Sequence, residues 1–399
     1  MPPPRSAQRR RFVDPETGER LDDGLVLWFP GPNSATGEDV AEFHVHGSRA
    51  VLAAIMQVLR RLGLRLAEPG EFTRRAFHNG KLDLLQAEAI ADLAAAETEA
   101  QRRQALRQLD GALGGLYRGW SQRLTRTLAH LEAAIDFPDE DLPPEIENRT
   151  CGDTELLIDE IDRHLADGRR GERLRDGISV AIIGPPNVGK SSLLNKIAHR
   201  EAAITSPIAG TTRDIVEVAI DLRGYPVVLA DTAGLRDSDD VVEQEGLRRA
   251  LRRAEEAEIR LFVFDACRPA EACGASAWAG PDTILVANKV DLVSGRGELP
   301  ASALPISALT GEGIDALLSA LGQRVAEGYQ IEAPVLTRVR HRQALEEASL
   351  SLRRALGAAL PELRAEDLRL ALRSLGRITG AVDVEDLLDV IFRDFCIGK

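Results

Sequence analysis

The feature that most constrains the fold is an eight-residue loop from Gly184 to Ser191, with the sequence GPPNVGKS. It matches the pattern G-x-x-x-x-G-K-[ST], follows the apolar run ISVAII and precedes SSLLNKIA, which has helical spacing. A strand, a glycine-rich loop and a helix in this order are typical of a phosphate-binding loop, because glycines let backbone N–H groups approach phosphate oxygens. Lys190 would neutralise phosphate charge, and the Ser191 hydroxyl would ligate Mg²⁺. The alternative interpretation is an incidental glycine-rich turn.

The identity of the base is predicted by a second loop, Asn288-Lys289-Val290-Asp291, which follows the strand-like run TILVAN. The carboxylate of Asp291 can accept hydrogen bonds from both the ring N–H and the exocyclic amine of guanine, and adenine cannot satisfy it in this way. The pattern N-K-x-D is weak alone, but here it lies after a P-loop and before Ser307-Ala308-Leu309. We therefore expect a guanine nucleotide, with a polar helix cap as the alternative.

Two further loops would bind Mg²⁺ and the γ-phosphate. Asp231 ends the run PVVLAD, where its carboxylate can hold the Mg²⁺ shell, and the N–H of Gly234 can then meet a γ-phosphate. Upstream, Thr212 in the segment GTTRD is the candidate for the second Mg²⁺ ligand. The residue after Gly234 is Leu235, where Ras-like proteins carry a water-orienting glutamine. The nearest replacements are downstream carboxylates, at Asp237, Asp239, Asp240, Glu243 and Glu245.

The hydrophobic spacing changes along the chain and predicts a multidomain protein. Short apolar runs separated by turn residues indicate an N-terminal α+β domain over residues 1–80, and Leu and Ala at helical spacing indicate a helical domain over 81–176. Strand-like runs then alternate with helical segments over 177–323, as in a Ras-like α/β P-loop domain. The helical pattern returns over 324–399, so we expect one helical domain interrupted by the α/β domain.

Composition limits the binding partners and the cellular location that we expect for the chain. The net charge of −13 argues against one broad basic surface for nucleic acid, although it leaves RNA possible as a shared substrate. No apolar run approaches the ~20 residues that span a bilayer, so we expect no membrane segment. The four cysteines show no C-x-x-C spacing and a chain this long needs no disulfide framework, so we expect a reducing, cytoplasmic location.

Beyond the nucleotide motifs, several segments resemble the MnmE (TrmE) family. They are PGPNSATGEDV, PGEFTRRAF, KLDLLQAEAIADL, AAIDFPDED and the terminal FCIGK, and the resemblance extends from Phe12 to Lys399. It implies a potassium-activated, homodimeric GTPase that acts with the FAD protein MnmG. Together they would modify the 5-position of the wobble uridine of certain tRNAs, by an aminomethyl or carboxymethylaminomethyl type of reaction. It also implies that the G domain is inserted into the helical domain.

The resemblance assigns roles to individual residues. Glu243 would orient the attacking water through a second water, and Lys190 would complete the catalytic set with Cys396 as a candidate nucleophile. A 5-formyl-tetrahydrofolate-type one-carbon donor would lie at Glu42, Lys81 and Lys399. Mg²⁺ would bind Ser191 and Thr212, and K⁺ would bind Asn187, Ser206, Ile208 and Thr211. The expected GTP-binding residues are Asn187, Val188, Gly189, Lys190, Ser191, Ser192, Ser206, Pro207, Ile208, Ala209, Gly210, Thr211, Thr212, Asp231, Thr232, Ala233, Gly234, Asn288, Lys289, Asp291, Ser307, Ala308 and Leu309.

Two departures from the family pattern accompany the resemblance. The chain starts MPPPRSAQRRRF where the family carries a segment with an ATPPG-R-G-like stretch, which leads us to expect an N-terminus shortened by several tens of residues. His46-Gly47-Ser48 stands where a second glycine is usual, a change that would alter only a turn. The nucleotide motifs alone also allow a different class of protein, a ribosome-assembly or scaffold GTPase that acts as a binding switch.

Overall fold

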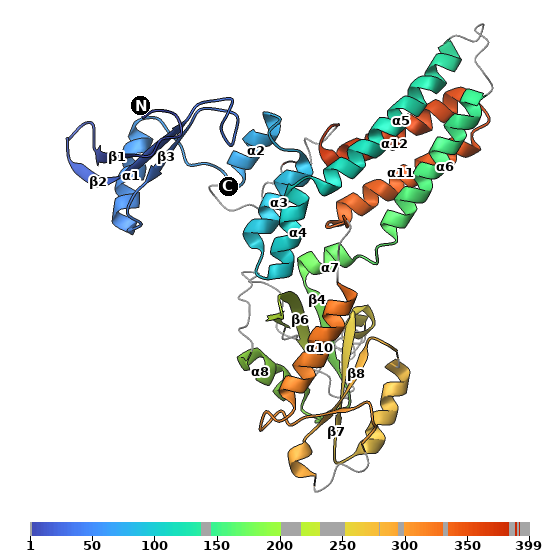
Figure 1. The fold of residues 1–399 in the computed structure, drawn as a ribbon. Coiled ribbons are helices and arrows are strands. Elements are labelled where there is room, and N and C mark those ends of the chain that lie inside the picture. Colours follow the sequence, from blue (N-terminus) through green and yellow to red (C-terminus); the bar gives the residue numbers. More distant parts are fainter. Residues whose placement is uncertain are drawn as a thin grey trace, which may run out of the picture. The chain divides into compact units, whose positions relative to one another are not determined.

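The computed structural model describes residues 2–136, 145–200, 217–231, 252–278, 280–293, 299–329 and 334–382, together with Leu388 and Ile391 (Figure 1). The chain divides into two compact units. The first comprises Met1–Ala94, Arg107–Ile161 and Gln343–Lys399, and the second comprises Ala95–Leu106 and Asp162–Arg342. The second unit is therefore inserted, in sequence, between parts of the first. The four-part division at residues 80, 176 and 323 stays a prediction.

The first unit begins with a small α+β part, as expected. Its sheet is antiparallel with the order β1-β2-β3, and the rings of Phe12 and Phe43 meet edge to face at 5.3 Å across it. Ser48, in the turn where the sequence departs from the family pattern, is the N-cap of the first helix, since its Oγ accepts the N–H of Val51 at 3.2 Å. The elements are β1 (Gln8–Val13), β2 (Arg20–Phe29), β3 (Val40–His44), α1 (Arg49–Arg61) and α2 (Glu71–His78).

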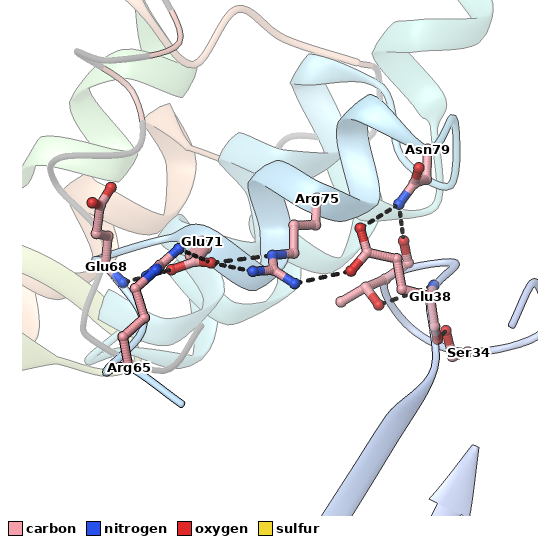
Figure 2. Close-up of polar contacts among 8 residues, drawn as sticks. Ser34, Glu38, Arg65, Glu68, Glu71, Arg75 and Asn79 are labelled. Atoms are coloured by element: carbon pink, nitrogen blue, oxygen red, sulfur yellow. Dashed lines mark hydrogen bonds and ion pairs between the residues drawn. The ribbon is translucent and has the colours of Figure 1, made fainter. Parts of the chain in front are cut away.

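Helix α2 is joined to its surroundings by a chain of charged groups (Figure 2). Glu71, in its first turn, accepts both terminal nitrogens of Arg65 at 2.7 and 2.8 Å and the backbone N–H of Glu68 at 2.8 Å. Arg75 donates to Glu71 and also to Glu38 in the β2–β3 turn, the latter at 2.9 Å. These contacts fix the first turn of α2 against the turn that precedes β3.

The helical part of the first unit is built on amphipathic stripes. Along α5, the buried residues Tyr117, Leu124 and Leu131 recur at intervals of seven, and α12 lies beside this helix (Figure 1). Arg369 of α12 pairs with Glu132 of α5 at 2.8 Å. The helices are α3 (Leu84–Ala95), α4 (Glu99–Leu109), α5 (Ala112–Asp136), α6 (Glu145–Leu165), α11 (Val339–Gly357) and α12 (Pro361–Thr379), of which α3, α4, α6 and α11 also extend into the second unit.

The second unit contains a six-stranded sheet with the order β5-β6-β4-β7-β8-β9. Only β5 and β6 are antiparallel; the other described pairs are parallel. Its core clusters include Ile182 of β4, Leu193 of α8 and Leu317 of α10 for one group and Phe262 and Ala287 for another. The elements are α7 (Arg170–Asp176), β4 (Ile178–Ile183), α8 (Lys190–Arg200), β5 (Glu217–Leu222), β6 (Tyr225–Asp231), β7 (Ile259–Asp265), η1 (Pro269–Trp278), β8 (Thr283–Asn288), η2 (Val290–Leu292), β9 (Leu304–Pro305) and α10 (Ile314–Gly328).

The topology decides where a ligand can bind. Strands β4, β7 and β8 are parallel neighbours, so the loops that follow their carboxyl ends meet at one edge of the sheet. In open α/β sheets this edge is the ligand-binding edge. The loop after β4 is Gly184–Gly189, and the loop after β8 follows Asn288, so the two predicted nucleotide motifs are brought together.

Candidate nucleotide site

The loop between β4 and α8 has a backbone that only particular residues can adopt. Gly184 and Gly189 have φ values of 141° and 94°, in the region that favours glycine. A Cβ on Gly184 would lie 2.0 Å from the carbonyl oxygen of Val263, and one on Gly189 would lie 2.4 Å from the side-chain nitrogen of Asn288. Gly184 is therefore required by close approach of the neighbouring backbone, and Gly189 by close approach of the Asn288 side chain.

Lys190 begins helix α8 and is only 7% exposed. Its ammonium donates to the carbonyl oxygens of Gly184 and Pro185, at 2.9 and 2.7 Å, so it lies across the loop. Ser191 and Ser192 follow in the first turn and are exposed. A phosphate placed on this loop would meet a fixed positive charge and the N-terminus of a helix, an arrangement suited to anions.

Asn288 joins the two motif loops. It is buried at the end of β8, where its side-chain nitrogen donates to the carbonyl oxygen of Val188 at 2.8 Å. Its side-chain oxygen accepts the N–H of Ala308 at 2.9 Å. Ser307, also buried, accepts the N–H of Thr310 at 3.1 Å, which closes the next turn. The asparagine therefore organises three loop segments, which explains its place in the pattern better than a helix-capping role.

Lys289 and Asp291 follow Asn288 in the second motif loop. Lys289 has a left-handed backbone, with φ 68°, and its ammonium donates to the carbonyl oxygen of Asn187 at 2.8 Å. Asp291 lies exposed in η2, and Leu309 on the neighbouring loop is 81% exposed. A carboxylate that faces water here can exchange that water for the N–H edge of guanine.

Asp265 is a site residue that sequence reasoning missed. It ends β7, and its carboxylate lies 2.8 Å from the Lys289 ammonium. Burial alone would raise its pKa, but the hydrogen bonds from Lys289 and from the N–H of Cys267 outweigh this effect and hold the pKa below its ordinary value. The available signal was an acidic residue at the end of the apolar run RLFVFD, beside the strand that ends in Asn288.

Part of the predicted site lies outside the described residues. These positions are Ser206, Pro207, Ile208, Ala209, Gly210, Thr211, Thr212, Thr232, Ala233, Gly234, Leu235, Asp237, Asp239, Asp240, Glu243, Glu245, Cys396 and Lys399. Asp231 is the last residue of β6, and its backbone alone is described. Over residues whose side chains are described, groups of His, Cys, Asp and Glu form no candidate metal centre.

The two described folate-site candidates lie in the first unit. Glu42 is exposed on β3, and its carboxylate lies 3.2 Å from the ring nitrogen of His44. Lys81 follows α2, and its Cε is 3.3 Å from the position that a Cβ on Gly37 would take. Within the described part of the chain, no hydrogen bond or ion pair links Glu42 with Lys81.

Among the helices that the structure describes, none has the length and apolar character needed to span a bilayer.

Comparison with known proteins places this geometry in a family. A model described as the MnmE helical domain matches residues 84–396, and one described as the GTP-binding protein TrmE N-terminus matches residues 1–81. The tRNA modification GTPase MnmE of Parvibaculum lavamentivorans is 59% identical over 402 residues, which cover 99% of this chain and 91% of the relative. The chain belongs to the MnmE family.

A second MnmE relative agrees. The tRNA modification GTPase MnmE of Rhodospirillum rubrum is 60% identical over 390 residues, which cover 96% of this chain and 86% of the relative. The resemblance read from the sequence is thereby confirmed, as is the combination of an N-terminal α+β part, a helical part and an inserted P-loop α/β part. The chain is accordingly a GTPase of the MnmE tRNA modification family.

Proposed function

We propose that this MnmE-family GTPase is activated by potassium and acts with an FAD-containing MnmG-type partner. The pair would modify the 5-position of the wobble uridine of certain tRNAs, by an aminomethyl or carboxymethylaminomethyl type of reaction. The chain would work in the cytoplasm as a homodimer that contacts tRNA through the complex. The extent of the family match supports the proposal, because the relatives named as tRNA modification GTPases align over most of their own length.

The potassium proposal rests on the exposure of Asn187 and on the contacts that this residue makes. This residue is exposed in the P-loop with φ 61°, and its backbone carbonyl is already held by Lys289. Its side-chain amide oxygen is the group left to ligate a cation, and amide and hydroxyl oxygens suit hard cations. Ser191, exposed in the first turn of α8, likewise fits Mg²⁺. The remaining proposed ligands are Thr212 for Mg²⁺ and Ser206, Ile208 and Thr211 for K⁺.

The protein's own residues then have distinct tasks. Lys190 would meet the β and γ phosphate oxygens, and Asp291 would select guanine by its N–H edge. Glu243 would orient the attacking water, a task that Leu235 cannot perform. A bound monovalent cation would add positive charge beside the phosphates, where an arginine finger contributes about 10³ to 10⁵ in rate in other GTPases. The rate of GTP hydrolysis would thus depend on which monovalent cation, potassium or sodium, is present in solution.

In the first unit we propose a site for a 5-formyl-tetrahydrofolate-type donor that includes Glu42, Lys81 and Lys399. A carboxylate such as that of Glu42 can pair with the N–H edge of a pterin. Cys396 remains a proposed nucleophile. The domain limits 1–80, 81–176, 177–323 and 324–399 belong to the same proposal.

A ribosome-assembly switch is not favoured. The family match includes residues 1–81, which lie outside the second unit, the one that contains the nucleotide motifs and is called the nucleotide unit below.

The test measures ion dependence and tRNA modification on the same variants. GTP turnover by the full chain is expected to rise several-fold when KCl replaces NaCl, and Asn187→Ala is expected to remove that difference. In cells that lack the gene, the wild-type chain should restore the modified wobble uridine, measured by mass spectrometry of tRNA nucleosides, and Asn187→Ala should not. Equal turnover in both salts would reject potassium activation, and unchanged nucleosides on gene deletion would reject the tRNA role.

A further inference from the structure

Asp265 is placed between two loops of the nucleotide site without belonging to either pattern. Its side chain is 13% exposed, and both carboxylate oxygens have partners. One accepts the Lys289 ammonium at 2.8 Å, and the other accepts the N–H of Cys267 at 2.9 Å. In the register of the sheet, Asp265 of β7 pairs with Asn288 of β8, so the carboxylate stands beside the start of the base-recognition loop.

Lys289 is held at two points. Besides Asp265, its ammonium donates to the carbonyl oxygen of Asn187 in the P-loop, also at 2.8 Å. Lys289 and Asn187 both have left-handed backbones, with φ of 68° and 61°. Such a conformation is unfavourable for lysine, although asparagine tolerates it, and it persists where the surrounding structure fixes it. The ammonium is the group that links these two left-handed positions.

A charge-assisted bond is the strongest contact available to fix that ammonium. A bond to an ionised partner is about twice as strong as one between neutral groups, and the carboxylate of Asp265 is mostly covered. Without it, the one partner that the lysine would keep among the described residues is the neutral carbonyl of Asn187, and its flexible stem would regain rotamer freedom. The loop that begins at Asn288 and the P-loop would then be less well aligned for one nucleotide.

We propose that Asp265 is a positioning residue for guanine-nucleotide binding, which holds Lys289 so that the base-recognition loop and the P-loop are aligned before the nucleotide arrives. The proposal rests on the GTP site itself and is independent of potassium activation. Since the alignment exists before binding, its loss should appear in nucleotide retention. The chemical step, which depends on other residues, should change little.

The first experiment uses Asp265→Asn in the full chain. Asparagine keeps the shape and an acceptor for the N–H of Cys267 but removes the negative charge. We expect a fluorescent GDP analogue to dissociate about three- to tenfold faster, the range for a partly covered charged hydrogen bond. The KM for GTP should rise by a similar factor with kcat nearly unchanged. The matched control is Asp282→Asn, exposed before β8, which should leave both values unchanged.

The second experiment separates positioning from a merely structural role. In a Lys289→Met background, Asp265→Asn should cause no further acceleration of GDP release, because the partner that it positions is gone. Asp265→Glu, which keeps the charge, should release GDP more slowly than Asp265→Asn. The same acceleration in both backgrounds would overturn the proposal, as would a release rate of Asp265→Asn equal to that of the wild type.

Discussion

At the scale of single residues, the nucleotide site depends on backbone that leaves no room for side chains. Gly189 is one such position, because its φ is 94° and a methyl group there would lie 2.4 Å from the side-chain nitrogen of Asn288. That nitrogen also holds the carbonyl of Val188, one residue earlier in the same loop. A change at Gly189 therefore disturbs both the P-loop and the residue that ties it to the neighbouring loops.

We expect Gly189→Ala to weaken GTP binding at least about fivefold. The strained φ and the displaced Asn288 together should cost about 1–3 kcal/mol. Titration calorimetry with GDP and GTP measures the loss, and thermal unfolding checks that the chain still folds. Gly280→Ala is the control, since a Cβ at this exposed glycine meets nothing within 4 Å. Affinity of Gly189→Ala within twofold of the wild type would contradict the steric argument.

Residue patterns predicted the site only where its chemistry is local in sequence. The P-loop and Asn288-Lys289-Val290-Asp291 are short patterns in which each residue type has a defined task, so they could be read directly. Asp265 could not, because its partner Lys289 lies 24 residues away and is brought beside it by the register of β7 on β8. Sequence spacing gives no direct measure of that register.

At the scale of elements, helix α2 depends on the ionised Glu71. Hydrogen bonds from Arg65, together with the N–H of Glu68 and Arg75, lower the pKa of this carboxyl to about 2 (Figure 2). Because the folded pKa is below the unfolded one, the stabilisation is fully present above the unfolded value, about 4.5. It is lost as the pH falls from about 4.5 toward about 2.

We therefore expect Glu71→Gln to increase amide hydrogen exchange in α2 at neutral pH. The arginine partners are largely exposed, so we expect an effect of only about 1 kcal/mol, or roughly fivefold in local opening. Exchange measured by mass spectrometry, corrected for intrinsic rates, should show the difference between variant and wild type shrinking as the pH approaches 2. A difference that stays constant down to that pH would refute the role of ionisation.

Helix α4 shows what periodicity can and cannot tell. The spacing of its residues in the sequence predicts a helix. It does not predict which segments pack against that helix, because the pattern of apolar and polar residues on a helix face carries no information about the contacting segment. The N–H of Ala100 donates to the carbonyl of Gly224 in the β5–β6 turn at 2.9 Å, and Gln104 donates to the carbonyl of Gly171 at 2.9 Å. The part of α4 up to Leu106, which is most of the helix, thus belongs to the second unit.

At the scale of the whole molecule, the inserted segment is closed by a buried ionic triad. Arg342, its last residue, donates to Glu172 and to Asp167, near its beginning, at 2.8 Å each. All three side chains are less than 10% exposed. The triad therefore joins the two ends of one long stretch of chain inside the nucleotide unit.

We expect Arg342→Met to destabilise the protein by about 3–5 kcal/mol, because two carboxylates would be left buried without their cation. The first thermal unfolding transition should move to lower temperature, measured by calorimetry. The comparison is Arg252→Met, since Arg252 is 79% exposed and its pair with Glu256 lies at the surface, where solvent screens the charges and the unfolding temperature should barely change. Similar shifts for both variants would contradict the importance of burial.

The insertion also sets the order in which the two units can be completed, and can fold, during synthesis. A ribosome releases the chain from its N-terminus, and domains generally fold as units once complete. The nucleotide unit is complete when Arg342 has emerged, whereas the first unit must wait for α11 and α12, which include the partner of α5. The usual N-terminal-first order is thus reversed: the nascent chain completes the part that binds GTP while the unit that started earlier is still open.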